Sequence, residues 1–297
     1  MGCTLVIDTS YGSTVGIVGR EPIVETDSRT HVERLQANIA RAVGEAGFTS
    51  SDIETIVVGL GPAPFTGLRA GIVAAKAIAF ATGARLIGQN VLEPQHEMLA
   101  AVMSDRDAFA GVDFLADVPR LVSNDMSRDR DDAAAQAEYA EIDRHVTLCV
   151  NDARRKQLYF TLIHGTTNMP DAEADANRWI GMDIDYPERI VERVNAELAA
   201  RSAYDGVRYV VDIAGHGAAK YADSWKGFGD TLGHVVDGSV LDAGKSGVAL
   251  FASCALTRGL RGDREVPVEP LYLRRPDAEI PAPLKHVLGH EGAKRAA

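Results

Sequence analysis

Apolar residues in the first hundred positions fall into short β-branched runs and longer stretches with helical spacing. The short runs predict strands, and apolar positions three and four apart predict helices. The expected strands are 4–7, 14–18, 23–24, 55–60 and 85–88, and the expected helices are about 32–46, 67–82 and 92–103. Three strands are thus followed by helices and strands in alternation.

The second half of the chain repeats this order less cleanly. Strands are expected at 146–151, 158–163, 179–182 and 207–214, with helices at about 187–200 and 246–258. From element order alone, we predict an α/β protein with two βββαβα-type halves, 1–103 and 145–275. This is the duplicated ribonuclease H-like fold of the actin-like ATPase (ASKHA) superfamily.

Two segments interrupt the pattern. Residues 104–144 hold 11 acidic and 5 basic side chains, and residues 166–185 hold 5 and 1, so most of the net charge of −11 lies there. We interpret 104–144 as an acidic insertion that buries little and is either mobile or a solvated helix. The tail, 276–297, is expected to be mobile apart from a short helix near its middle.

Composition narrows the functional class. No apolar run approaches the length of a membrane span, and the first ten residues lack a secretory pattern. Three widely spaced cysteines, Cys3, Cys149 and Cys254, predict neither a disulfide framework nor a zinc site. We therefore expect a cytoplasmic protein. Because no basic stripe is visible, the chain alone is expected to bind tRNA poorly.

A strand–loop–helix unit at residues 56–81 stands out. Gly59 and Gly61 allow sharp turns, and Thr66 is an N-cap candidate. The loop lacks a Gly-Lys-Ser/Thr ending, and Pro62 and Pro64 remove two amide donors, so a structural turn is favoured over phosphate binding. Small residues four apart on the helix predict a flat surface, which faces either a partner helix or the helix's own domain.

This unit carries a family resemblance. Residues 61–71, Gly-Pro-Ala-Pro-Phe-Thr-Gly-Leu-Arg-Ala-Gly, resemble the Gly-Pro-Gly-Ser-Phe-Thr-Gly-Leu-Arg-x-Gly motif of the bacterial TsaB (YeaZ) family. The loop departs at Ala63 and Pro64, so it is expected to be stiffer. Shorter matches occur at 31–35, 152–159 and 270–274. The main motif residues are His31, Glu33, Arg34, Gly61, Pro62, Phe65, Thr66, Gly67 and Arg69.

The resemblance implies a nucleotide cleft between the halves. It would be lined by Asp8, Thr9, Ser10, Asp152, Arg154, Gly215 and Gly217. In the alternative, Asp8 and Asp152 only accept hydrogen bonds from turn amides. Active ATPases of this class have glycine where Ser10 or Tyr11 stands, and Tyr11 would crowd a triphosphate. We expect no resident cofactor and at most vestigial binding of ATP or ADP with Mg²⁺.

A catalytic paralogue, TsaD, carries a His-x-x-x-His metal pair. The corresponding positions here are Val91 and Gln95, which are poor ligands, and His96 is one step away without a second histidine four residues on. We therefore predict no metal site and interpret His96 as a surface histidine.

The resemblance implies a non-catalytic subunit of the complex that forms threonylcarbamoyladenosine in tRNA. Its partners would be a TsaD-type catalytic subunit and a TsaE-type ATPase, with tRNA bound indirectly through the complex. The sequence leaves open whether the chain forms a homodimer when alone. The predicted partner-facing residues are Leu35, Ile39, Val43, Leu68, Gly71, Ala74, Ala75 and Ile78. The alternatives are an active kinase or ATPase of the superfamily and a glycoprotease-type peptidase.

Overall fold

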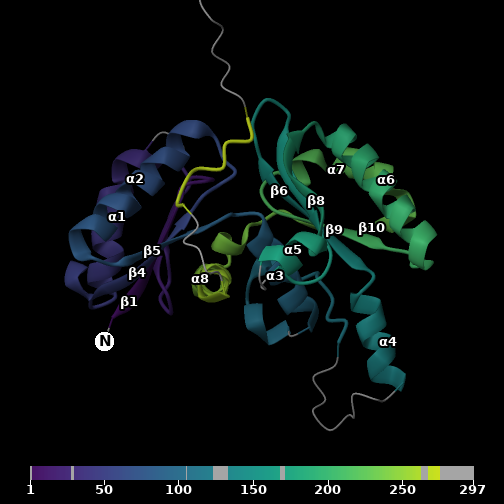
Figure 1. Ribbon diagram of the computed structural model, residues 1–297, viewed down its shortest axis with the longest axis horizontal. Helices are drawn as coiled ribbons and strands as arrows, with labels where there is room; N and C mark the ends of the chain where they lie inside the picture. Colours follow the sequence, from purple (N-terminus) through teal and green to yellow (C-terminus); the bar gives the residue numbers. More distant parts are fainter. Residues whose placement is uncertain are drawn as a thin grey trace, which may run out of the picture.

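Two five-stranded sheets stand side by side in the computed structural model, which describes residues 2–27, 30–104, 106–122, 133–167, 171–261 and 267–274 (Figure 1). The strand order is β3-β2-β1-β4-β5 in the first sheet and β8-β7-β6-β9-β10 in the second. In each, the first three strands are antiparallel and the next two run parallel to the first. The predicted duplicated ribonuclease H-like fold is confirmed.

The first half follows the predicted order closely. Its elements are β1 (Cys3–Asp8), β2 (Ser13–Ile17), β3 (Ile23–Glu25), α1 (His31–Glu45), β4 (Ile53–Gly59), α2 (Phe65–Thr82), β5 (Arg85–Gln89) and α3 (Glu93–Ser104). Leu5, Val6 and Ile7 are fully buried because helices cover both faces of the sheet. The N-cap of α2 is Pro64 rather than Thr66, which lies exposed in the first turn.

The second half contains elements that the sequence pattern did not indicate. Its elements are β6 (His145–Asp152), β7 (Leu158–Ile163), α5 (Asp171–Asn177), β8 (Arg178–Asp185), α6 (Pro187–Asp205), β9 (Val210–Ala214), α7 (Ala222–Trp225), β10 (Leu232–Val236) and α8 (Gly244–Arg261). Helices α5 and α7 were missed because they are short, and strand β10 because Gly233 and His234 interrupt its apolar run.

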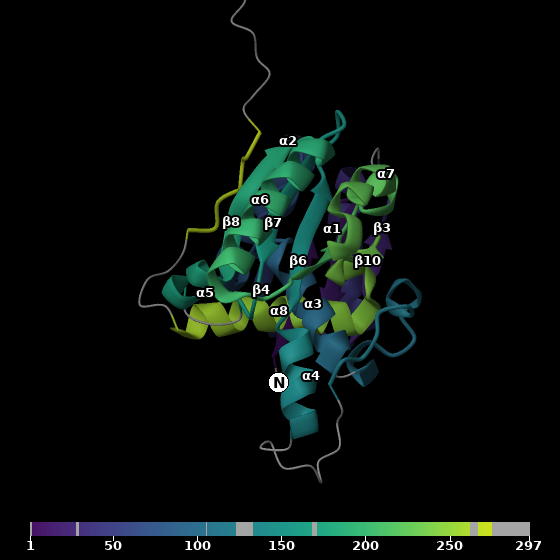
Figure 2. The same cartoon turned by 90° about the vertical axis from the view of Figure 1, so that its right-hand side faces the viewer.

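The last helix of each half packs against the other half. Helix α3 contacts β6, β7 and β9 of the second sheet, whereas α8 contacts β1, β2 and β5 of the first. Figures 1 and 2 show α3 and α8 beside each other between the sheets, with α1 and α2 outside one sheet and α6 and α7 outside the other. One central core therefore joins Val6 and Val57 with Met98 and Phe251.

The residues predicted to face a partner lie instead in a second core, under α1 and α2. Leu35, Ile39, Val43, Leu68, Gly71, Ala74 and Ala75 are buried there, and Ile78 is half-buried against it. The partner prediction is wrong for these residues. Their small size lets α2 lie close to its own sheet: a Cβ on Gly71 would stand 2.3 Å from Thr9 Oγ1.

Part of the acidic insertion is also packed. Phe109, Leu115 and Val118 are buried in the central core, so the prediction that residues 104–144 bury little is wrong for 106–122. Helix α4 (Ala133–Ile142) is mostly exposed, as expected of a solvated helix. Residues 123–132 and the tail 276–297 lie outside the described residues.

Residues 267–274, called the strap below, return across both halves (Figure 1, yellow). Val268 and Leu271 pack against the core under α2, and Leu271 N donates to Leu60 O at 2.8 Å. At the far end, Arg274 Nη2 donates to Gln157 Oε1 at 2.7 Å, in the turn between β6 and β7. The strap thus ties the two halves together from outside.

We expect Gly71→Ala to lower the free energy of unfolding by about 1–3 kcal/mol, because the new methyl group overlaps the β-branched Thr9. Gly44→Ala is the control. Gly44 lies in α1 with no heavy atom near its added Cβ, so alanine there should stabilise by about 0.5–1 kcal/mol. Urea unfolding measures the stability of both variants. An equal increase in the free energy of unfolding for the two variants would contradict the close approach of α2.

Candidate functional site

The first predicted carboxylate caps a turn. Asp8 ends β1, and its Oδ2 and Oδ1 accept hydrogen bonds from Ser10 N (3.0 Å) and Ser10 Oγ (2.7 Å). Burial raises the pKa of Asp8 above its ordinary value, although the Ser10 hydrogen bonds oppose the shift. Strand β4 also passes close to this carboxylate, because a Cβ added to Gly59 would stand 1.9 Å from Asp8 Oδ1.

The second predicted carboxylate is also engaged. Asp152 Oδ1 accepts from Arg154 N at 2.8 Å, and Asp152 Oδ2 accepts from Lys220 Nζ at 2.8 Å. This hydrogen bond raises the pKa of Lys220. Both aspartates therefore bind turn amides, as the structural alternative predicted.

A ring stack crosses the cleft between these turns. Tyr11 of the first half lies on His216 of the second, with ring centroids 3.9 Å apart, and His216 Nε2 lies 2.6 Å from Asp242 Oδ2. Burial by itself would raise the pKa of Asp242, but His216 lowers it below the ordinary value. The space left around Asp8 and this stack is about 10 Å³, roughly enough for one water molecule.

Tyr11 also lines a larger cavity of about 310 Å³. Its lining brings together Thr9, Ser10, Asp152 and Arg154, four of the seven predicted cleft residues. Asp8 lines the smaller space. Gly215 and Gly217 instead shape the turn after β9, where Gly217 N donates to Asp237 Oδ1.

The positions compared with the paralogue's metal pair are buried and hold no cluster of ligands. Gln95 Nε2 donates to Val91 O (3.1 Å) and to Val150 O (3.2 Å), which links α3 to β6. The interpretation of His96 as a surface residue is wrong: it is buried, with Nδ1 2.8 Å from Thr147 Oγ1, and burial lowers its pKa. In the described ranges, no group of three or more His, Cys, Asp or Glu side chains could hold a metal ion.

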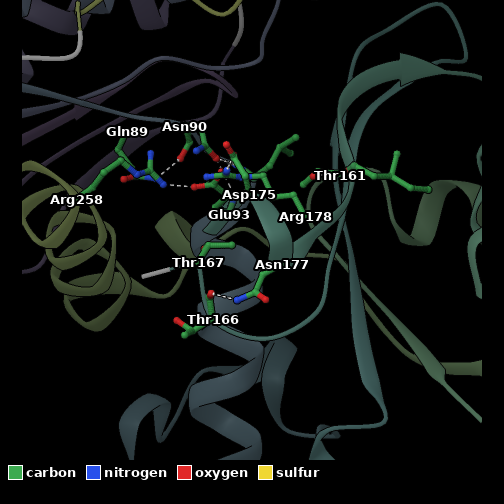
Figure 3. Close-up of polar contacts among 12 residues, drawn as sticks. Gln89, Asn90, Glu93, Thr161, Thr166, Thr167, Asp175, Asn177, Arg178 and Arg258 are labelled. Atoms are coloured by element: carbon green, nitrogen blue, oxygen red, sulfur yellow. Dashed lines mark hydrogen bonds and ion pairs between the residues drawn. The ribbon is translucent and has the colours of Figure 1, made fainter. Parts of the chain in front are cut away.

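Sequence reasoning missed a buried ion cluster beside this region (Figure 3). The carboxylate of Glu93, at the start of α3, contacts Arg178 of β8 at 2.7 Å and Arg258 of α8. Burial by itself would raise the pKa of Glu93, but the two arginines lower it below its ordinary value. Since the partners lie 85 and 165 positions away, local pattern gave no signal for this cluster.

The family-motif residues have several structural roles. Gly61 and Pro62 are buried, and Asn151 Nδ2 donates to Pro62 O at 3.1 Å across the halves. Arg34 pairs with Glu25, whereas Glu33 is exposed and the His31 side chain lies outside the described residues. Phe65, Thr66 and Arg69 are exposed at the start of α2, and Gly67 lines the larger cavity.

The outer face of α2 is apolar as well as the inner one. Val73 is 64% exposed and Phe80 is 94% exposed. By length and composition alone α2 could span a membrane, yet its buried residues, 28% of the helix, pack on the sheet. An exposed apolar face on a helix whose other face is already packed marks a candidate interaction surface.

Residues 19–104 match the model of the family described as TsaD, tRNA N6-adenosine threonylcarbamoyltransferase. An uncharacterized protein of Mycobacterium tuberculosis H37Rv is 43% identical over 91 residues, which are 28% of this chain. The chain spans 43% of the length of that relative. A tRNA N6-adenosine threonylcarbamoyltransferase of Clostridium botulinum is 44% identical over 71 residues, or 24% of this chain and 21% of that protein.

Solved structures extend the comparison to most of the chain. YeaZ from Pseudomonas aeruginosa aligns with a TM-score of 0.51 and 18% identity, covering 92% of this chain and all of that one. The chain has the YeaZ fold. A second structure, described as an uncharacterized protein with similarity to peptidase YeaZ from the same organism, aligns with a TM-score of 0.53 and 19% identity. It covers the same shares of the two chains. The resemblance to the TsaB (YeaZ) family is thus confirmed at the level of the fold.

We expect the isolated chain to bind MgATP with a Kd of about 1 mM or weaker, equivalent to roughly −4 kcal/mol. The Tyr11–His216 stack occupies the cleft, and both aspartates are engaged in turns. Titration calorimetry checks this. Tight binding that requires Mg²⁺ and disappears in Asp8→Asn would contradict the closed cleft.

We expect Glu93→Gln to destabilise the protein by up to about 3–5 kcal/mol at pH 7, because it removes the buried carboxylate that two partly buried arginines share, although Arg178 keeps its ion pair with Asp175. The folded pKa of Glu93 is depressed, so its contribution is complete above the ordinary value of 4.5 and is lost as the pH falls through the folded pKa. The difference in unfolding free energy between the variant and the wild type should therefore become smaller at acidic pH. Denaturant unfolding at several pH values measures it.

The control is Glu45→Gln, which breaks an exposed pair with Arg41 and should cost no more than about 1 kcal/mol. A Glu93→Gln effect as small as the control's would show that the cluster does not hold the halves together.

Proposed function

We propose that the chain is a non-catalytic subunit that pairs with a TsaD-type transferase and supports formation of threonylcarbamoyladenosine in tRNA. The supporting comparisons are the YeaZ fold and the match of residues 19–104 to the TsaD family model. The structural observation that carries the proposal is the exposed apolar face of α2.

The pairing surface consists of the α2 residues that turn away from the sheet. Val73, Lys76, Ala77, Phe80 and Ala81 are exposed at helical spacing, in contrast to the buried Ala74 and Ala75. A large aromatic side chain surrounded by small residues is the usual form of an interface anchor, because the small neighbours let a partner helix come close. This surface replaces the residues proposed from the sequence.

The cleft geometry supports a role without chemistry of its own. The phosphate-side turns are held by their own side chains, and the Tyr11–His216 stack occupies the space between the halves. In the proposed assembly the TsaD-type subunit supplies the transfer chemistry, a TsaE-type ATPase joins the pair, and tRNA binds indirectly through the complex. Three buried free cysteines support a cytoplasmic location.

We expect Phe80→Asp to weaken pairing with the TsaD-type subunit at least tenfold while the chain stays folded, because it replaces the most exposed large apolar side chain of the surface with a charged one. Co-purification and titration with the TsaD-type subunit measure pairing, and circular dichroism on the same sample measures folding. Modification of tRNA by the reconstituted complex should fall in parallel.

Tyr204→Asp is the matched control. Tyr204 is a 92% exposed aromatic residue near the end of α6, on the outer face of the other half. Normal pairing by Phe80→Asp, or equal weakening by Tyr204→Asp, would contradict the assignment of α2. Size exclusion of the isolated chain tests the homodimer: if α2 also drives self-association, Phe80→Asp should convert a dimer to a monomer.

A further inference from the structure

A basic turn joins β6 and β7 at the edge of the cleft. Arg154, Arg155 and Lys156 are exposed and have φ angles of 62°, 51° and 62°, in the left-handed region that non-glycine residues rarely adopt. The turn is closed by Ala153 N donating to Gln157 O and Gln157 N donating to Arg154 O, each at 3.0 Å. Three consecutive cationic side chains are thereby held on one short turn.

The strap brings a fourth cation and an aromatic ring to this turn. Arg274 Nη2 donates to Gln157 Oε1 at 2.7 Å. Two residues earlier, Tyr272 stacks on Phe65 of α2, with centroids 4.9 Å apart and an angle of 26° between the rings. Phe65 is 50% exposed and Tyr272 is 41% exposed, so the pair keeps ring surface open to solvent.

A fifth cation lies over the aromatic pair. The Arg69 guanidinium carbon is 4.3 Å from the centroid of Phe65 and 6.0 Å from that of Tyr272. Phe65, Arg69, Tyr272, Arg274 and the turn 154–156 form one neighbourhood, called the strap surface below. Its cations come from three distant parts of the chain, so no basic stripe is visible in the sequence.

Two acidic groups near the strap surface are paired with other cations. Asp152 contacts Lys220 at 2.8 Å, and Glu269 of the strap contacts Lys76 at 3.0 Å. In a protein of net charge −11, five cations next to an open aromatic stack are a local reversal of sign. Such a reversal favours a polyanionic ligand, and the open rings favour one that carries flat groups.

We propose that the strap surface binds single-stranded nucleic acid, with the basic turn contacting phosphates and the Phe65–Tyr272 pair stacking on an unpaired base. A duplex fits less well, because its bases are already stacked and cannot reach the rings. This inference goes beyond the proposed pairing and uses different residues from the Val73–Phe80 face.

The test measures fluorescence anisotropy of the full chain with a short labelled RNA that has no secondary structure. The other probes are the same RNA annealed to its complement and the DNA of the same sequence. Arg154→Glu should weaken binding to the single strand at least tenfold and reduce the salt dependence by about one phosphate contact or more. Tyr272→Ala should weaken it about tenfold with an unchanged salt dependence, since it removes stacking and no charge.

Arg189→Glu, an exposed change of the same charge on α6, is the control and should lower the affinity much less than Arg154→Glu. Preferential binding of duplex, an equal effect of Arg189→Glu, or displacement of RNA by polyglutamate as readily as by unlabelled RNA would overturn the proposal. RNA binding tighter than DNA binding would assign the ligand to RNA, and equal binding would assign it to single strands of either kind.

The pairing proposal and the single-strand-binding proposal can be tested independently. Arg154→Glu should still pair normally with the TsaD-type subunit, and Phe80→Asp should still bind the single strand. Loss of pairing in Phe80→Asp with no single-strand binding by the wild type would leave the proposed function standing and sink this inference alone.

Discussion

The arrangement of this protein depends on the buried contact between Glu93 and two arginines, Arg178 and Arg258. Each partner comes from a different element: α3 from the first half, β8 from the second and α8 from the end of the chain. A buried carboxylate is tolerable only when it is compensated, so the three elements must meet at this point. Their meeting joins α3 and α8 between the two sheets, where the two halves approach each other.

That approach determines what the cleft can do. With the halves held together, Tyr11 reaches His216, and the space around Asp8 shrinks to about the size of one water molecule. The carboxylates of Asp8 and Asp152 accept hydrogen bonds from the turns that follow β1 and β6. The space beside Asp8 is thus filled, while a cavity of about 310 Å³ lined by Tyr11, Asp152 and Arg154 stays open.

Helix α2 shows how one element can serve the core and the surface at once. Its small residues, Gly71, Ala74 and Ala75, allow a close approach to β1 and β4, and they leave the larger Val73 and Phe80 on the outside. The N-terminal end of the same helix contributes Phe65 and Arg69 to the strap surface. We propose that the outer face with Val73 and Phe80 binds a partner protein, and that the N-terminal end with Phe65 and Arg69 contributes to binding a single-stranded nucleic acid.

The sequence by itself determined the element order, because β-branched runs and helical spacings are local properties of the chain. Strands β1 to β9 and the helices α1, α2, α3, α6 and α8 were predictable on that basis, whereas β10 was not. Periodicity does not say which face of a doubly apolar helix turns inward. Only the tertiary structure decided that Ala74 is buried and Phe80 exposed, that His96 is buried, and that residues 106–122 join the core. It also assembled the Glu93 cluster and the strap surface, since charges separated by a hundred residues are brought together by packing alone.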